Sequence, residues 1–263
     1  MKFYKKSLGQ NFLIDKNIIK KIVSLSNVKD KNILEIGPGT GALTDQILKR
    51  KPKSLMLIEK DYQLFDVLKK KYKNNKIVSI YNKDILKFNL EQKLKKDSII
   101  FGNLPYNISS QILVKMIKFK KWPPNYNTLI FMFQKEMADR IKSHCGNPKY
   151  GRLSIITYYR LIIKDSFDVS PNSFFPRPKI KSTVILFKPK NENIYRIKKL
   201  DNLEFITNQF FTKKRKMINK TLNKIFKSNE KISLIKNINL ENRPSDLSPD
   251  KYFKITKLFE ENF

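Results

Sequence analysis

Short apolar runs alternate with amphipathic segments along the first half of this sequence. Between residues 33 and 136, each run rich in Ile, Leu, Val or Phe is followed by a stretch whose apolar side chains recur at helical spacing. Strands that alternate with helices pair in parallel, because each helix returns the chain to the same edge of the sheet. The sequence therefore predicts an α/β protein with a Rossmann-like, doubly wound and mostly parallel sheet.

The individual elements follow from the same pattern. Strands are predicted at 33–36, 54–61, 76–85, 98–106 and 128–136, and helices at 17–25, from about 41, at 62–72, at 110–119 and from about 135. Two further strands, 161–170 and 182–190, flank a proline-rich connection and are expected to close the sheet antiparallel. From residue 191 the strand pattern ends, and 203–227 and 249–262 have helical spacing. We expect a catalytic domain over 1–190 and a small all-helical domain over 191–263.

The segment "EIGPGTGA" ends the first predicted strand of the sheet and opens a helix. Gly37 and Gly39 permit a tight turn with close approach of a ligand, and the N–H groups at the helix start face that ligand. The spacing satisfies the permissive dinucleotide fingerprint. A purely structural strand-to-helix turn would give the same string.

Acidic residues end the next two strands. Glu59 stands 22 residues after Gly37, where a carboxylate can accept hydrogen bonds from both hydroxyls of a ribose. Asp84 ends the third strand and could meet the amino group of an adenine. The alternatives are a surface acid for Glu59 and a helix cap for Asp84.

The stretch "NLPY" at the end of the fourth predicted strand is typical of an enzyme that transfers a methyl group to an amine. An exocyclic adenine nitrogen is a poor nucleophile, because its lone pair is delocalised into the ring. Hydrogen bonds from that amine to the Asn103 side-chain oxygen and the Leu104 carbonyl would free the lone pair, and Pro105 would hold both acceptors rigid. Tyr106 could stack on the target base. This chemistry needs no metal, and no metal site is evident in the sequence.

The charge balance points to a polyanion as partner. The chain has 55 Lys and Arg against 23 Asp and Glu, a formal net charge of +32. Only eight of the basic residues are arginines, and lysine abounds everywhere, as a coding bias toward AT-rich codons would also produce. With one cysteine, Cys145, no internal disulfide is possible. No apolar run is long enough for a membrane span or a secretory signal, so we expect a cytoplasmic protein.

The motifs together strongly resemble the ribosomal RNA adenine N6-dimethyltransferases, a family that includes the KsgA-type housekeeping enzymes and the erythromycin-resistance enzymes. Nine segments carry the resemblance: "KKSLGQNFL" (5–13), "LEIGPGTGALT" (34–44), "NKDIL" (82–86), "GNLPYNIS" (102–109), "QKEMADRI" (134–141), "YGRLSI" (150–155), "SFFPRPKIKSTV" (173–184), "FFTKKRKMINKTL" (210–222) and "RPSDLSP" (243–249). The last two look like the housekeeping enzyme. The resemblance implies a fold that binds S-adenosylmethionine. It also implies dimethylation of two adjacent adenines in the hairpin loop near the 3′ end of 16S ribosomal RNA, in the immature 30S particle.

The resemblance also implies roles for single residues. Asn11 and Leu13 would close over the cofactor, Gly37 would lie behind its methionine part, and Gly39 would also belong to the cofactor site. Glu59 would hold the ribose, Asp84 the adenine, and Asn103 would lie beside the reacting methyl group.

Phe174, the first Phe of "FFP", would form a second aromatic wall opposite Tyr106, with Phe175 as the less favoured register. In the tail, a basic helix with Phe211 and Ile218 facing inward is expected to contact RNA backbone, although such a helix can also be a merely solvated face. Its candidate RNA-binding residues are Lys213, Lys214, Arg215, Lys216 and Lys220.

Three other functions remain open at this level. An NAD-dependent oxidoreductase would explain the glycine fingerprint but has no use for "NLPY". A noncatalytic RNA assembly factor would explain the basic tail, and a DNA adenine methyltransferase would use the same chemistry. No motif demands a dimer, and we expect a monomer.

Overall fold

The computed structural model describes residues 11–191, 195–228, 232–233, 235 and 238–262. The chain divides into two compact units. The first comprises 1–138 and 162–189, and the second comprises 139–161 and 190–263. The chain thus enters the second unit twice, since residues 139–161 group with the C-terminal helices. Whether the units divide the work as catalytic and RNA-contacting parts stays a prediction.

The first unit is built on a seven-stranded sheet of order β4-β3-β2-β5-β6-β9-β7. Strands β2 to β6 pair in parallel, whereas β9 is antiparallel to β6. The predicted mostly parallel sheet with an antiparallel closing strand is therefore confirmed. The strand bounds are β2 (Asn32–Ile36), β3 (Ser54–Glu59), β4 (Val78–Asn82), β5 (Ser98–Asn103), β6 (Tyr126–Gln134), β7 (Leu161–Val169) and β9 (Ser182–Pro189).

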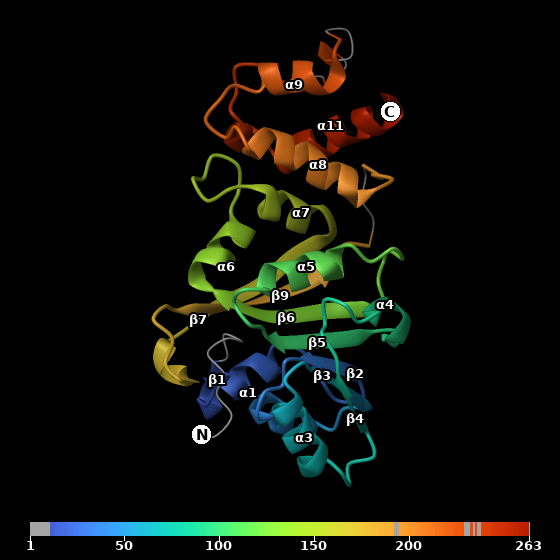
Figure 1. The fold of residues 1–263 in the computed structure, drawn as a ribbon, viewed down its shortest axis with the longest axis vertical. Coiled ribbons are helices and arrows are strands. Elements are labelled where there is room, and N and C mark those ends of the chain that lie inside the picture. Colours follow the sequence, from blue (N-terminus) through green and yellow to red (C-terminus); the bar gives the residue numbers. More distant parts are fainter. Residues whose placement is uncertain (1–10, 192–194, 229–231, 234, 236–237, 263) are drawn as a thin grey trace. The chain divides into compact units, whose positions relative to one another are not determined.

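Helices pack against this sheet on both faces (Figure 1). Alternate apolar side chains of β2, β3, β5 and β6 join one buried cluster with the apolar sides of α1, α2 and α3, for example Ile33 with Ile22 and Ile47. α5 lies on the other face (Figure 1). The helix bounds are α1 (Lys16–Ser24), α2 (Ala42–Lys49), α3 (Tyr62–Lys71), α4 (Leu90–Lys93), α5 (Ser109–Ile117) and α6 (Lys135–Lys142).

A second, two-stranded sheet was not predicted. β1 (Phe12–Leu13) pairs antiparallel with β8 (Phe174–Phe175), in the register Phe12 to Phe175 and Leu13 to Phe174. The chain leaves β1 through Asp15, whose carboxylate accepts the N–H groups of Asn17 and Ile18 and caps α1. Segments about 160 residues apart in the sequence are thereby brought together at the start of the first helix.

The second unit is helical, with α7 (Arg152–Arg160), α8 (Leu200–Phe211), α9 (Asn219–Phe226) and α11 (Pro249–Asn262). The prediction of one helix over 203–227 is wrong, because a turn at 212–218 separates α8 from α9. Ile218 is fully buried, and its N–H donates to the carbonyl of Asn242, which draws the chain out of helical geometry. Among the described residues, no helix is long and apolar enough to cross a membrane.

Candidate active site

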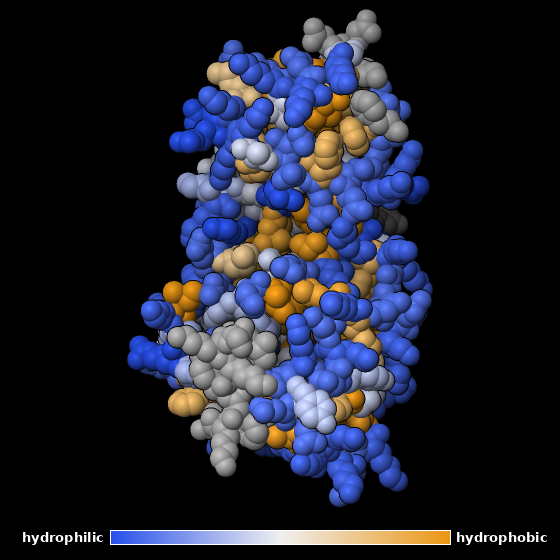
Figure 2. Space-filling model, in the orientation of Figure 1, coloured by the Kyte–Doolittle hydropathy of each residue, from blue (hydrophilic) through white to orange (hydrophobic). Residues whose placement is uncertain are grey.

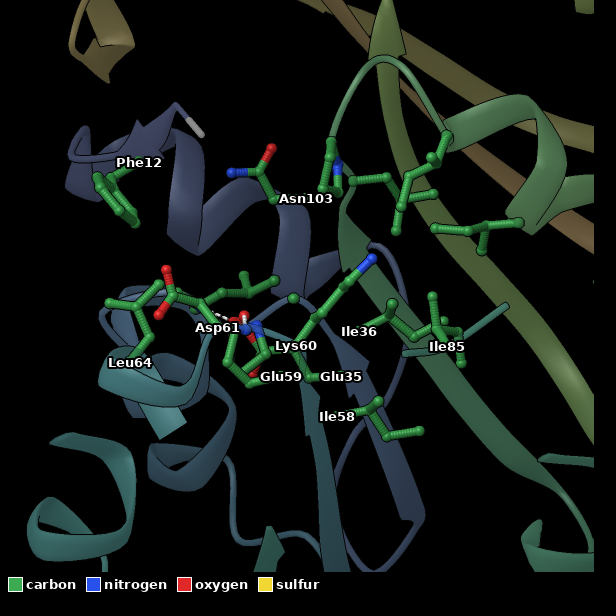
Figure 3. Close-up of a pocket in the computed structure, with 18 of the residues that line it drawn as sticks. Phe12, Glu35, Ile36, Ile58, Glu59, Lys60, Asp61, Leu64, Ile85 and Asn103 are labelled. Atoms are coloured by element: carbon green, nitrogen blue, oxygen red, sulfur yellow. Dashed lines mark hydrogen bonds between the residues drawn. The ribbon is translucent and has the colours of Figure 1, made fainter. Parts of the chain in front are cut away.

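Four neighbouring strands end at one pocket in the first unit (Figure 3). The carboxyl ends of parallel strands share an edge of the sheet, so residues far apart in sequence meet there. Ile36, Ile58 and Ile85 form an apolar end of this pocket, and acidic side chains lie beside them (Figure 3). The predicted site residues that line it are Asn11, Leu13, Gly37, Gly39, Glu59, Asp84, Asn103, Leu104, Pro105 and Tyr106. Of segment 5–13, residues 5–10 lie outside the described residues.

The glycine turn between β2 and α2 needs its glycines for two separate reasons. Gly37 and Gly39 have φ angles of +67° and +60°, in the left-handed region that favours glycine. A Cβ atom on Gly39 would also lie 3.1 Å from Cδ1 of Phe12. The backbone of this turn therefore lies close to Phe12 of β1, and both segments line the pocket.

Glu35 lines the pocket but was not predicted as a site residue. It is 2% exposed, and its Oε2 accepts a 2.6 Å hydrogen bond from the Thr44 hydroxyl. Burial raises the pKa of Glu35 to about 8. Its place two residues before Gly37 was the available signal, but an acid inside a strand gives no indication of which side it faces.

Glu59 is held by main-chain donors. Its Oε1 accepts the N–H of Asp61 at 2.9 Å, and its Oε2 accepts the N–H of Gly39 at 3.2 Å. Burial raises the pKa of Glu59, and these two N–H groups work against that rise. The carboxylate is thus fixed at the end of β3, and its remaining lone pairs can accept further hydrogen bonds.

Asp84 follows β4 and is held differently. Its Oδ2 lies 2.9 Å from the ammonium of Lys60, and its Oδ1 accepts the N–H of Leu86 at 2.9 Å. The hydrogen bond from Lys60 is the main cause that lowers the pKa of Asp84. Lys60 also lines the pocket and was not predicted, because lysine is so common in this chain that one more carried no signal.

Asn103 is the last residue of β5, and its side chain lines the pocket (Figure 3). Its Nδ2 donates a 3.1 Å hydrogen bond to the carbonyl of Asn11. Nitrogen and oxygen of an amide are told apart by such bonds. Because the amide nitrogen donates to Asn11, the amide oxygen remains available as an acceptor, and no described residue donates to it.

The next three residues form a rigid turn. Leu104 is buried, and a Cβ atom on Gly102 would lie 2.5 Å from its Cδ2, so a larger residue before Asn103 would displace the Leu104 side chain. Tyr106 is held at both ends: its carbonyl accepts the Ser109 hydroxyl at 3.1 Å, and its phenol oxygen lies 2.6 Å from Oγ of Ser182. Burial raises the pKa of Tyr106, and the hydrogen bond with Ser182 works against that rise.

Phe174 does not line the pocket. Although it was predicted to form an aromatic wall opposite Tyr106, Phe174 is 3% exposed and belongs to the buried cluster that contains Leu13. Phe175, the less favoured register, is 45% exposed. Alternation along β8 explains the difference, because adjacent side chains point to opposite faces. Contact of Phe174 with a base would require its ring to leave this cluster.

Four of the five predicted RNA-binding residues lie on the turn between α8 and α9 and not along a helix. Lys213, Arg215 and Lys216 are exposed on the turn, and Lys220 is exposed at the start of α9. Lys214 differs, since its ammonium donates to the carbonyls of Pro148 at 2.6 Å and Tyr150 at 3.1 Å. Lys214 thus stabilises the second unit itself. Hydrophilic residues cover most of the face in view (Figure 2), as the lysine-rich composition predicts.

Comparison with known proteins gives a consistent result. The family described as "Ribosomal RNA adenine dimethylase" matches residues 1–261. The chain is 47% identical over 257 residues to ribosomal RNA small subunit methyltransferase A of Pelagibacter ubique, covering 98% of this chain and 97% of that protein. It is 39% identical over 258 residues to the protein of the same name from Malacoplasma penetrans, covering 96% and 91%.

Solved structures share the fold. A dimethyladenosine transferase from Plasmodium falciparum matches with a TM-score of 0.76 and 25% identity, over 93% of this chain and 95% of that one. The 23S rRNA methyltransferase ErmE matches with a TM-score of 0.69 and 21% identity, over 96% and 99%. The second likeness concerns the fold alone.

Proposed function

This chain belongs to the ribosomal RNA adenine dimethylase family, and from that premise we propose that it dimethylates N6 of two adjacent adenines near the 3′ end of small-subunit ribosomal RNA. We further propose that the substrate is the immature 30S particle in the cytoplasm and that the enzyme acts as a monomer. S-adenosylmethionine is the methyl donor that the family implies. The oxidoreductase reading has no support beyond the glycine fingerprint.

The pocket residues fit that donor. The buried Glu59 carboxylate, fixed by two main-chain N–H groups, suits the two hydroxyls of a ribose. The apolar end beside Asp84 suits a purine with an exocyclic amine, and the glycine turn leaves room for the methionine part. When bound, the donor supplies a methyl group on a positively charged sulfur. Every other requirement of the reaction falls on residues of this chain.

The observation that carries the proposal is the fixed orientation of the Asn103 amide. With its nitrogen donating to Asn11, its oxygen can accept a hydrogen bond from one N–H of the adenine amine, and the carbonyl of Leu104 can accept one from the other N–H. Both bonds favour a pyramidal nitrogen whose lone pair points away from the acceptors and toward the methyl group. Pro105 and the buried Leu104 side chain keep the acceptors in place before substrate binds, so no reorganisation is needed during reaction.

The aromatic walls select a flat, unstacked base. The Tyr106 ring, whose phenol oxygen is bonded to Ser182, offers one stacking face to an adenine that has left its helix. Phe174 stays our proposal for the opposite wall, with the added requirement that its ring leave the core. If Phe175 serves instead, Phe175→Leu will lower the methylation rate and Phe174→Leu will chiefly lower stability.

Methyl transfer from tritiated S-adenosylmethionine tests the function. We expect incorporation into undermethylated 30S subunits at two adjacent adenines and none into duplex DNA. Incorporation into DNA alone would contradict the ribosomal assignment. Asn103→Ala is expected to lower kcat at least 100-fold, by analogy with the loss of one preorganised polar group in other active sites. Asn125→Ala is the matched control, since its amide also donates to a carbonyl, that of Leu94, but lies outside the pocket.

The exposed cations of the second unit are proposed to contact RNA backbone. Replacing Lys213, Arg215 and Lys216 by Gln should weaken binding to the 30S subunit and reduce its dependence on salt, because each phosphate contact releases a counterion. Lys214 is left out of this set because its ammonium is already bound to two carbonyls. An unchanged salt dependence would mean that these residues form a merely solvated face.

A further inference from the structure

The phenol oxygen of Tyr106 and the hydroxyl of Ser182 lie 2.6 Å apart. Ser182 is the first residue of β9, it is fully buried, and it does not line the pocket. Tyr106, in contrast, lines the pocket and stands on the turn after β5. A buried hydroxyl on one strand thus reaches the far end of a pocket-lining ring on another.

Tyr106 would be poorly oriented without this contact. Its carbonyl is fixed by Ser109, but a bond at the carbonyl leaves the side chain free to change rotamer. A second bond at the phenol oxygen fixes the far end of the ring and therefore the χ1 rotamer, which sets the direction in which the ring extends from the backbone. Among the described residues, Ser182 is the hydrogen-bond partner of that phenol oxygen.

We propose that Ser182 is a positioning residue, which holds the Tyr106 ring in the place where the target adenine stacks on it. The inference rests on the proposed function for the identity of the base, but the hydrogen bond itself can be tested without RNA. Ser182 does not touch the base, so its contribution acts only through Tyr106.

The two ends of the bond can be removed separately in the full-length chain. Tyr106→Phe keeps the ring and removes the phenol oxygen, and Ser182→Ala removes the partner. We expect each variant to lower kcat about 3- to 10-fold, as the loss of one hydrogen bond would, with the KM for S-adenosylmethionine unchanged. The double variant should be no slower than either single one. Thr183→Val is the matched control, because it removes a buried hydroxyl from the next position of β9, where the partner is Asp168.

A spectroscopic measurement separates this inference from the proposed function. In protein labelled with 13Cζ-tyrosine, the Tyr106 signal is assigned by its absence in Tyr106→Phe. It should move in Ser182→Ala and stay in place in Thr183→Val. If the wild-type protein is inactive on 30S subunits, the proposed function is contradicted. The Tyr106 signal would still show whether the hydrogen bond to Ser182 exists.

Either of two results would overturn the inference. One is an equal loss of rate from Ser182→Ala in the wild-type and Tyr106→Phe backgrounds. The other is a Tyr106 signal that keeps its position in Ser182→Ala. If Ser182→Ala does not fold, Tyr106→Phe carries the test alone. In that case an unchanged kcat would overturn the inference.

Discussion

The inner and outer acids of the pocket are stabilised in opposite ways. Glu35 and Glu59, at the ends of β2 and β3, are buried and their pKa values are raised by burial. Asp84, one strand further out, is partly exposed, and the ammonium of Lys60 lowers its pKa. The inner acids are held by a hydroxyl and by backbone N–H groups, whereas the outer acid is held by a mobile side chain.

This difference predicts how each acid responds to change. A backbone donor cannot move away, so loss of its acceptor leaves a buried N–H group unpaired, which costs about 1 to 3 kcal/mol. A surface ammonium returns to water when its partner is lost, at a cost of about 0 to 1 kcal/mol. Substitutions at the inner acids should therefore affect stability and binding together, and those at the outer acid binding alone.

The largest effect is expected from Glu59→Ala. Loss of the carboxylate removes the acceptor for the ribose and leaves the N–H groups of Gly39 and Asp61 unpaired. We expect affinity for S-adenosylhomocysteine, measured by calorimetry, to fall at least 100-fold, with stability lowered by about 1 to 3 kcal/mol. Glu91→Gln is the control: Glu91 also accepts two main-chain N–H groups, of Lys120 and Lys121, but lies outside the pocket. Unchanged affinity in Glu59→Ala would remove Glu59 from the ribose site.

Glu35→Gln should change how stability depends on pH. The pKa of Glu35 is about 8 in the folded protein and 4.5 as its ordinary value, so the folded state holds a proton that the unfolded state has lost. The contribution of Glu35 to stability is complete below pH 4.5 and is lost as pH rises toward 8. Between pH 5.5 and 7.5, the wild type should lose about 2 kcal/mol of unfolding free energy relative to Glu35→Gln. Parallel urea-unfolding curves across this range would contradict a buried, protonated Glu35.

Asp84→Asn should weaken ligand binding with little change in stability. The asparagine oxygen can still accept the Leu86 N–H, but the charge that Lys60 and an adenine amine would meet is gone. We expect affinity for S-adenosylhomocysteine to fall about 5- to 10-fold, as for loss of one charge-assisted hydrogen bond. Asp66→Asn breaks the exposed Asp66–Lys70 pair and serves as control. A large loss of stability would show that Asp84 is a structural acid like Glu59.

The smallest effect is expected from Lys60→Met, which keeps the length of the side chain and removes its charge. Affinity for S-adenosylhomocysteine should fall about 2- to 3-fold at low salt, and the difference should vanish at high salt, where exposed pairs are screened. The measurement is calorimetry at two ionic strengths. A difference that persists at high salt would mean that Lys60 contacts the ligand directly.

The sheet and the rim of the site could be predicted because both follow from local patterns. Apolar periodicity located each strand, and the residue that ends a parallel strand lies at the rim whatever its partners are. Glu59, Asp84 and Asn103 were found in this way. Their hydrogen-bond partners could not be predicted, because Asn11, Gly39 and Lys60 reach them only through the fold.

The helical unit was less predictable for a related reason. The spacing of apolar residues is the same whether the chain runs as one helix or breaks at 212–218, and the break depends on hydrogen bonds to 240–242. The same limit applies to Phe174 and Phe175, since only the pairing of β8 with β1 decides which ring is buried. Lys214 could not be distinguished from its neighbours, because its two carbonyl partners lie more than 60 residues away.

The bond between the Asn103 amide and the carbonyl of Asn11 has a consequence for what can replace Asn103. An aspartate there would place an anionic oxygen against that carbonyl, and their repulsion would push Asn11 and the adjoining strand β1 away from the glycine turn. A chain shortened to begin after Leu13 would keep every side chain of the "NLPY" turn yet let the amide rotate freely. In such a protein, kcat should fall even when the methyl donor is saturating, in addition to any loss of affinity for that donor.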